Sequence, residues 1–365
     1  MDLTFPPLPC SLGLDLHQDE TVSWSRLQHL HSPNTSRRAV LFPPGEPSCT
    51  SVLQSSQLGN CYFIAALSVL AEHPAYLRRL FAATLSVPPT SCESDGRWTV
   101  NLHHNGQWRQ VSIDDYLPTT AFASSSGSTS NSQLYCGHNR PGCGFWVALF
   151  EKAYAKVYGS YGAIAGGDIA ESLRDLSGSP VFSLRIDHGD GIEMVKNGKL
   201  WNLLVERTQA GHLLACGWCG SAAQTLSYLS KRDDKKIKTK HSATEIIVPN
   251  HAYAILNCVV KKGKKMLEIR NPWGKFEAAD EQLADRSGCL WLSFDVWVTA
   301  VNALYSCVLH HTELLKQDHG CLQSHSLVTV SGEWQGGKAG GVEKIRLGDV
   351  TLNMSSLLLA WAQST

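Results

Sequence analysis

The longest apolar stretch of the chain lies between Cys61 and His73, where almost every residue is hydrophobic. Apolar residues on all sides of a helix are typical of a helix that is buried all round. The pattern therefore predicts a buried helix over 61–73, which Pro74 is expected to end. A second stretch, 144–158, repeats its apolar residues at helical spacing. A further helix is expected within 159–176, after a glycine-rich turn.

Other stretches alternate in the way that strands do. In 97–114 the alternation is interrupted at Asn105-Gly106, a pair typical of a tight β-hairpin. After about residue 180 short strands are expected, and 244–274 is interpreted as two strands joined by a Lys/Gly turn. The strand-rich region continues through 288–301. The pattern predicts an α+β protein with a helical half followed by a β-rich half.

Two polar stretches are interpreted as loops. Residues 119–133 are of low complexity, which is typical of a surface loop or an insertion. Residues 231–241, "KRDDKKIKTKH", are expected to form a solvated loop, with a patch for a partner as the alternative. Gly166-Gly167 is not a phosphate loop, because no strand and no G-K-[ST] accompany it.

Composition narrows the classes of function. The 32 basic and 32 acidic residues cancel, so overall charge favours neither nucleic acid nor an anionic membrane as partner. No run of eighteen apolar residues appears, so no integral membrane segment is expected. The first twenty residues lack the basic and apolar regions of a secretory signal. A length of 365 residues is enough for two or three compact units.

The twelve cysteines, without such a signal, predict reduced thiols in the cytoplasm. Two pairs, Cys216/Cys219 and Cys136/Cys143, leave a metal or redox role open as an alternative. A zinc site would need a second pair of ligands at suitable spacing, and none follows. A redox motif would need a βαβ unit, which the pattern does not indicate.

Cys61 stands at the start of the 61–73 helix, behind Gly59-Asn60. A helix N-terminus lowers the pKa of a thiol and favours the nucleophilic thiolate. Taken alone, Cys61 would more often be a buried core residue than a nucleophile. His251 opens the strand "HAYAIL" in the β-rich half, and twenty residues later Asn271 begins "NPWG". Paired strands would bring the two side by side, so that the asparagine amide orients the imidazole, as in a Cys–His–Asn triad.

Trp273 is expected to cover the hydrogen bond between the histidine and the asparagine and to exclude water from it. Because the cysteine lies in the helical half and the histidine in the β-rich half, a cleft is expected between the two halves.

These motifs, in this order, resemble the protease core of the calpain family. The segments "QLGNCYFIAALSVLAE", "FWVALFEKAYAKVYGSYGAIAGG", "NHAYAIL" and "EIRNPWG" carry the resemblance, and "LWLSFDVW" is similar to the closing segment of that core. "FPPLPCSL" and "VSWSRL" match the lead-in of the family, and "SGEWQGGKAGG" resembles the opening of the β-sandwich domain that follows its core.

The resemblance implies a papain-like fold of two lobes with a cleft. The domains expected are a lead-in over 1–45, a helical lobe over 46–180, a β-rich lobe over 181–312 and a partial β-sandwich segment over 313–365. About fifty residues follow the core, whereas a complete sandwich needs roughly a hundred.

The resemblance also assigns roles. Cys61 would attack the scissile carbonyl after His251 takes its proton, with Asn271 orienting His251. A glutamine side chain would help to hold the oxyanion. In the family this glutamine stands six residues before the nucleophile, where this chain has Ser55. Gln54, seven before, is preferred to Gln57, four before.

Calcium regulation of the core, which is typical of the family, is expected to be impaired. Calcium needs several carboxylate and carbonyl oxygens. The acidic residues expected near the nucleophile are replaced by Ser51 and Val52, and Gly162 stands where the family has another acid. Glu277 remains as the candidate calcium ligand in the second lobe. The chemistry itself requires no cofactor.

The sequence thus predicts an intracellular cysteine endopeptidase that makes limited cuts in protein substrates. The alternative is a weakly active or inactive scaffold that binds proteins through the same cleft. A metal-binding or redox protein is the third hypothesis. The sequence gives no indication of the oligomeric state.

Overall fold

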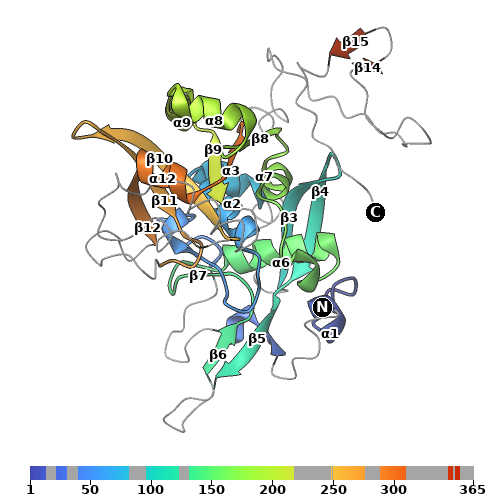
Figure 1. Cartoon of the computed structure of the whole chain (residues 1–365). Coiled ribbons are helices and arrows are strands. Elements are labelled where there is room, and N and C mark those ends of the chain that lie inside the picture. Colours follow the sequence, from blue (N-terminus) through green and yellow to red (C-terminus); the bar gives the residue numbers. More distant parts are fainter. Residues whose placement is uncertain are drawn as a thin grey trace.

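This computed structural model describes residues 1–13, 22–30, 40–81, 96–122, 131–217, 248, 250–275, 288–309, 344–347 and 350–353. It combines helices with antiparallel sheets, which confirms the predicted α+β class (Figure 1). Two parts carry the candidate residues: a helical part that contains Cys61 and a six-stranded sheet that contains the strand following His251.

The helical part is built around α2 (Cys61–Leu70), which is buried along almost its whole length. Its other helices are α3 (Pro74–Leu80), α6 (Trp146–Tyr158) and α7 (Ile169–Ser177). Three small sheets complete it, and they are formed by β1 (Val22–Arg26) with β5 (Tyr116–Phe122) and β6 (Asn131–Leu134), by β3 (Arg97–His104) with β4 (Gln107–Asp114), and by β2 (Val52–Leu53) with β7 (His138–Asn139). Short helical turns are α1 (Pro9–Leu12), η1 (Leu27–His29), η2 (Cys49–Ser51) and η3 (Gly162–Ile164).

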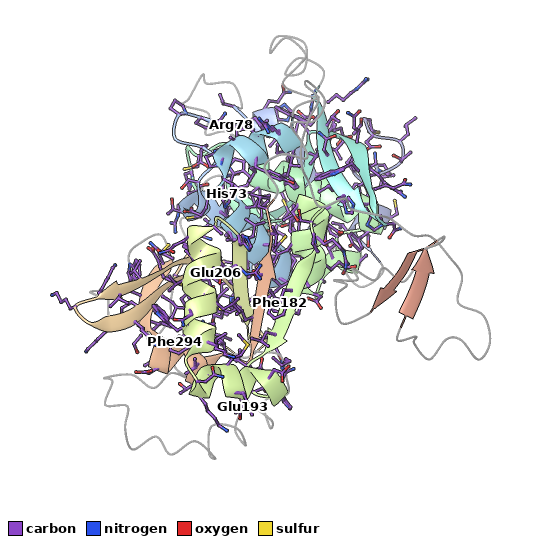
Figure 2. The ribbon with its side chains drawn as sticks, turned by 90° about the horizontal axis from the view of Figure 1, so that it is seen from above. His73, Arg78, Phe182, Glu193, Glu206 and Phe294 are labelled. Carbon is purple, nitrogen blue, oxygen red and sulfur yellow. The ribbon has the colours of Figure 1, made fainter. Side chains whose placement is uncertain are left out.

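The second part is an antiparallel sheet with strand order β12-β11-β10-β9-β13-β8. Its strands are β8 (Val181–Arg185), β9 (Leu213–Gly217), β10 (Ala252–Lys261), β11 (Lys264–Arg270), β12 (Cys289–Ser293) and β13 (Ala303–Cys307). Helices α8 (Gly189–Lys196), α9 (Lys199–Gln209) and α12 (Phe294–Ala300) accompany it. In Figure 2, Glu206 and Phe294 lie with this sheet, whereas His73 and Arg78 lie in the helical part.

The sheet separates two hydrophobic cores, because successive side chains of a strand point to opposite faces. In β10, Ala252 and Ala254 belong to the core of the helical part, whereas Tyr253 and Ile255 belong to the other core. The alanine face packs against α2, and the opposite face packs against α9. Small side chains on the first face allow the buried helix α2 to approach the sheet closely.

Several expected elements are confirmed, among them the hairpin at Asn105-Gly106 and the helix of 144–158, now α6. The helix that begins at Cys61 is shorter than expected, since it ends at Leu70, and Pro74 is the first residue of α3. Proline suits a first helical turn, where its missing N–H has no partner to lose.

Two interpretations of the sequence need correction. Part of the stretch 119–133 is strand, because β5 continues to Phe122 and β6 begins at Asn131, with only 123–130 outside the described residues. The region after residue 180 also contains α8 and α9, which an expectation of short strands alone had missed. The stretch 231–241 lies outside the described residues.

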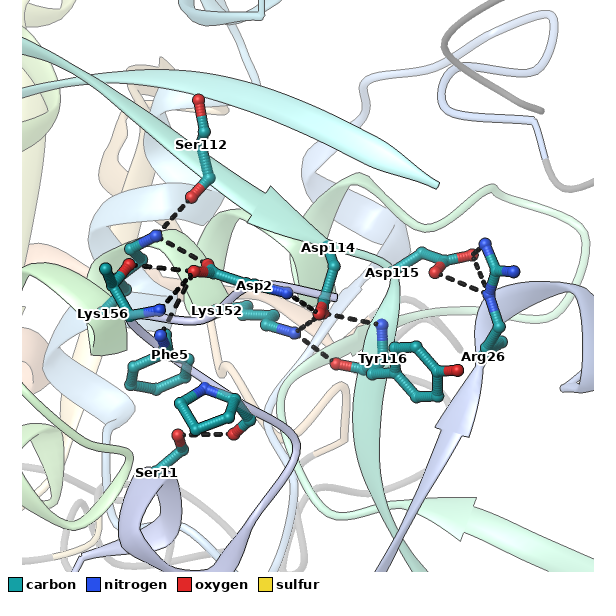
Figure 3. Close-up of polar contacts among 12 residues, drawn as sticks. Asp2, Phe5, Ser11, Arg26, Ser112, Asp114, Asp115, Tyr116, Lys152 and Lys156 are labelled. Atoms are coloured by element: carbon teal, nitrogen blue, oxygen red, sulfur yellow. Dashed lines mark hydrogen bonds and ion pairs between the residues drawn. The ribbon is translucent and has the colours of Figure 1, made fainter. Parts of the chain in front are cut away.

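The beginning of the chain is fastened to the helical part (Figure 3). The backbone N–H of Asp2 donates to Asp114 Oδ2 at 2.6 Å, and Lys156 Nζ lies 2.6 Å from Asp2 Oδ2. Lys152, buried on α6, is paired with the same Asp114. Phe5 is buried in the hydrophobic core. The start of the expected lead-in is therefore part of the packed structure.

Little of 313–365 is described. A short antiparallel hairpin of β14 (Lys344–Leu347) and β15 (Val350–Asn353) lies within it, and the rest of the predicted β-sandwich segment is outside the described residues. Across the described ranges, no helix is long and apolar enough to cross a membrane.

Candidate active site

His251 and Asn271 are brought together by the pairing of β10 with β11. His251 directly precedes β10, and Asn271 directly follows β11. The strands are antiparallel, with Ala254 opposite Arg270, so the start of one lies beside the end of the other. His251 Nε2 lies 2.9 Å from Asn271 Oδ1, and both residues are buried. The hydrogen bond predicted from the sequence is present.

The orientation of the Asn271 amide determines which imidazole nitrogen carries the proton. Asn271 Oδ1 also accepts a hydrogen bond from the backbone N–H of Trp273 at 3.0 Å. The oxygen is therefore the atom that faces His251, and Nε2–H must donate to it. In the neutral imidazole this leaves Nδ1 with its lone pair, ready to accept a proton.

Two aromatic rings enclose the imidazole of His251. The indole of Trp273 lies with its centroid 4.3 Å away, tilted by 35°, and Tyr253 meets the ring edge-on at 4.9 Å. Burial lowers the pKa of His251, while the hydrogen bond to Asn271 acts in the opposite direction. A lowered pKa keeps the imidazole neutral near pH 7, the form needed for a general base. Trp273, which was predicted to cover the His251–Asn271 hydrogen bond, contacts the imidazole ring of that pair.

Cys61 is the first residue of α2 and is half-buried. Helix α2 packs against β10 and β9, so the element that begins with Cys61 meets the strand that begins after His251. A helix N-terminus concentrates partial positive charge, which stabilises a thiolate.

Most of the other described thiols are in environments that favour the protonated form. Burial raises the pKa of Cys216 to about 12, of Cys258 to about 11 and of Cys307 to about 12. It also raises the pKa of Cys136 well above the ordinary value. These four are suited to packing rather than to nucleophilic attack.

Gln54 lies next to the turn that follows Asn271. Its backbone N–H donates to the carbonyl of Pro272 at 2.9 Å, and its side-chain Nε2 donates to the carbonyl of Leu58 at 2.9 Å. Gln54 Oε1 is buried without a hydrogen-bond partner. Ser55 is buried, and its hydroxyl accepts a hydrogen bond from the backbone N–H of Gln57. Gln57 itself is exposed. Of the candidates for the oxyanion, Gln54 is the one whose backbone contacts the turn after Asn271.

The structure describes the positions at which the resemblance implies acidic calcium ligands that this chain lacks. Ser51, at a position where the family has an acid, uses its hydroxyl to donate to Glu46 Oε2 at 2.7 Å, and Val52 is buried. Gly162 offers no side chain. A hydroxyl held in an internal hydrogen bond and a buried valine do not fit the oxygen ligands that calcium requires. Glu277 lies outside the described residues.

The described residues contain no group of three or more His, Cys, Asp or Glu side chains arranged to hold a metal ion. Cys216 is buried and accepts a hydrogen bond from Trp297 Nε1 at 3.4 Å, while Cys219 lies outside the described residues. Cys136 and Cys143 are both free thiols. Nothing in these contacts supports the metal or redox alternative.

Sequence reasoning missed three residues around the site. Asn60, which precedes Cys61, is fully buried; Glu151 is fully buried on α6; and Arg270 crosses from β11 to the helical part. The signal for Glu151 was available, since a charged pair at 151–152 directly follows five apolar residues of the helix. Its partners were not predictable, because they lie far away in the sequence.

The model of the calpain family cysteine proteases matches residues 1–295 of the chain. The chain belongs to this family. The match covers both the helical part and most of the six-stranded sheet, including all three candidate catalytic residues. The α+β fold with two cores agrees with the papain-like fold of calpain proteases, as predicted.

Relatives agree with this assignment. The calpain-type cysteine protease ADL1 of Oryza sativa subsp. japonica is 27% identical over 368 residues, which cover 94% of this chain and 15% of that protein. The calpain-2 catalytic subunit of Gallus gallus is 27% identical over 369 residues, covering 93% and 46%, and human calpain-8 is 28% identical over 380 residues, covering 94% and 47%. This calpain-family chain thus spans less than half the length of these relatives.

Proposed function

We propose that this calpain-family protein is a cysteine endopeptidase that makes limited cuts in protein substrates. The observation that carries the proposal is the hydrogen bond of His251 to Asn271 beneath Trp273, which leaves Nδ1 as the proton acceptor. The nucleophile in this proposal is Cys61, which lies within the matched range and is the first residue of α2.

The reaction follows from these groups. The thiol proton of Cys61 passes to His251 Nδ1, and the thiolate sulfur attacks the scissile carbonyl carbon. As the C–N bond breaks, the imidazolium returns its proton to the leaving amine, and a thioester to Cys61 remains. Water, deprotonated by His251, hydrolyses the thioester and restores the thiol.

The oxyanion is stabilised by the backbone N–H of Cys61 and the side chain of Gln54. The amide nitrogen of a glutamine carries two N–H donors, and Gln54 directs one of them to Leu58. The second is the donor assigned to the oxyanion. Loss of such a donor costs about a hundred- to a thousand-fold in kcat. The kcat of Gln54→Ala is therefore expected to be lower than that of the wild type by that factor.

Calcium is not given a step in this mechanism, because the residues at the expected positions do not fit it. For location, we propose a reducing intracellular compartment, the cytoplasm. None of the nine cysteines that the structure describes forms a disulfide, which supports this location.

Labelling with an epoxide inhibitor of cysteine proteases tests the proposal. The expected result is one adduct located by mass spectrometry at Cys61, together with hydrolysis of a denatured protein substrate that is abolished by Cys61→Ser. Cys143, half-buried in the segment between β7 and α6, is the internal control for general thiol reactivity. Labelling of Cys143 with Cys61 untouched, with and without calcium, would overturn the proposal in favour of a non-catalytic scaffold.

A further inference from the structure

Glu151 is a fully buried carboxyl group beneath the start of α2. Its two oxygens share the backbone N–H of Gly137, at 3.0 Å each. A side chain at Gly137 would collide with this carboxyl, because a Cβ there would lie 2.3 Å from Glu151 Oε2 and 2.7 Å from Ile64 Cδ1 of α2. The absence of a side chain at 137 is thus what lets the loop and the carboxyl meet.

Among the described residues, no cation is paired with Glu151 to balance an ionised carboxylate. The titratable groups that face it are the phenols of Tyr62 on α2 and Tyr161 before η3, and the thiol of Cys136 before β7. All three have raised pKa values and are neutral at pH 7. The neighbouring Lys152 forms its ion pair with Asp114 and not with Glu151. Burial consequently raises the pKa of Glu151 to about 7, although Gly137 and Asn60 act in the opposite direction.

The second group that influences Glu151 is the side-chain amide of Asn60. Asn60 is fully buried, and neither its Oδ1 nor its Nδ2 makes a hydrogen bond of regular geometry. Buried amides without partners are rare because desolvation of each polar atom is costly. The Asn60 amide is therefore a buried polar group next to the Glu151 carboxyl, with which it can form a hydrogen bond.

Asn60 is connected to both candidate oxyanion donors. Its carbonyl accepts the first hydrogen bonds of α2, from Phe63 and Ile64, and its own chain leads directly into Cys61. Its backbone N–H donates to the carbonyl of Leu58 at 2.9 Å, the same oxygen that receives Gln54 Nε2. A movement of Asn60 is thus transmitted both to the N–H of Cys61 and to the Gln54 side chain.

A second path leads from Glu151 to Gln54. Gly137 is followed by β7, which pairs with β2, with Val52 opposite Asn139 and Leu53 opposite His138. The next residue after β2 is Gln54. The carboxyl therefore supports the segment 52–61 from both of its ends.

We propose that Glu151 is a positioning residue that sets the Asn60 amide, and through it the start of α2, according to its own protonation. This inference rests on the proposed protease function only for its activity readout. The neutral acid donates its O–H to Asn60 Oδ1 while its other oxygen accepts from Gly137 N–H. The carboxylate can only accept, so Asn60 must present Nδ2 to it. The change of partner turns the amide by half a turn, and the neutral form is the competent one.

Glu151→Gln tests this assignment, because a glutamine amide is permanently a donor to Asn60 and an acceptor from Gly137. Two readouts are measured from pH 5.5 to 8.5: kcat/KM on a peptide substrate and the rate of Cys61 alkylation by iodoacetamide, mapped by mass spectrometry. For each readout, the ratio of variant to wild type is expected to be near one at pH 5.5 and to rise roughly two- to tenfold by pH 8.5. This factor corresponds to the free energy of about one hydrogen bond. A ratio that does not change with pH overturns the proposal.

Two further variants separate the route from general effects. Asp175→Asn is the matched control, since burial also raises the pKa of Asp175 to about 7 but its carboxyl bonds the hydroxyl of Tyr158. It is expected to leave the pH dependence of Cys61 unchanged. In an Asn60→Ala background the effect of Glu151→Gln is expected to disappear, and its persistence there would overturn the route through Asn60.

The alkylation readout keeps the two proposals apart. A pH-dependent ratio in alkylation without any hydrolysis supports the role of Glu151 and refutes the protease function. Hydrolysis with a constant ratio does the reverse. Circular dichroism and urea denaturation of each variant at pH 5.5 establish that the compared proteins are folded.

Discussion

The direction of one hydrogen bond determines what the imidazole of His251 can do. Because Asn271 Oδ1 accepts from the Trp273 backbone, it also receives Nε2–H of His251 and leaves Nδ1 with the lone pair that accepts the proton of Cys61 in the proposed reaction. The bond is shielded by the indole ring, so water competes weakly for it. The asparagine thus stabilises this tautomer and, in the proposed reaction, would also stabilise the imidazolium.

Asn271→Ala removes this acceptor and is expected to lower kcat by roughly ten- to a hundred-fold, since hydrogen bonds to charged groups are worth about 1.5–3 kcal/mol. Steady-state kinetics of peptide hydrolysis measures the loss. Asn101→Ala is the control: its amide bonds the carbonyl of Leu80 at 3.2 Å, within the helical part. An equal loss of kcat in both variants would mean that Asn271 acts only through stability.

Glu151 also makes stability depend on pH. Its pKa in the folded protein, about 7, lies above the ordinary value of 4.5. Its contribution to the free energy of unfolding is therefore fully present below about pH 4.5 and is lost as the pH rises to 7. Relative to wild type, Glu151→Gln is expected to gain about 3 kcal/mol between pH 4.5 and 7.5. Urea denaturation at several pH values measures this gain, and a constant difference would contradict it.

At the scale of elements, the site depends on where segments begin. Helix α2 begins at Cys61, β10 begins after His251, and Asn271 follows the end of β11. Local signals in the sequence, namely an apolar run behind a cysteine and two strands around a Lys/Gly turn, were sufficient to predict these three positions. The contacts of Glu151 with Gly137 and Asn60 were not predictable, because they join segments whose packing no local pattern specifies.

The extent of helix α2 shows the same limit of prediction from local sequence. The apolar run continues past Leu70, and periodicity alone extends the helix to His73, yet the structure starts a new helix at Pro74. A proline is compatible both with a helix end before it and with a helix start at it. Tertiary packing decides between the two: Tyr76 and Leu77 of α3 are buried in the same core.

Gly137→Ala tests how tightly the loop before β7 fits against α6 and α2. Its Cβ would meet Glu151 Oε2 at 2.3 Å and Ile64 Cδ1 at 2.7 Å, so buried atoms must shift. A loss of about 1–3 kcal/mol in the free energy of unfolding is expected for such overpacking. Gly59→Ala is the control, because a Cβ there meets nothing within 4 Å. Equal midpoints of urea denaturation for both variants would contradict the prediction.

At the scale of the whole molecule, Arg270 ties the sheet to the helical part. This fully buried arginine at the end of β11 donates to Ser68 Oγ of α2 at 2.9 Å and to the carbonyl of Val52. One planar guanidinium serves both acceptors, which a lysine cannot reach at once. The contact holds the two parts together one residue before Asn271.

Arg270→Lys is therefore expected to lower the free energy of unfolding by about 1–3 kcal/mol, the cost of leaving a buried polar group without its partner. Ser68→Ala removes only one of the two contacts and is expected to cost about 1 kcal/mol. Urea denaturation of both variants measures the difference. A larger loss in Ser68→Ala than in Arg270→Lys would contradict the role given to Arg270.

The six-stranded sheet serves both cores at once, with the alanines of β10 on one side and Tyr253 and Ile255 on the other. Because the sheet contributes side chains to both cores, unfolding of its central strands would expose both cores to water. Exchange of backbone amide hydrogens with deuterium should accordingly be slowest in the middle of β9 and β10, where it reports the global unfolding of the chain.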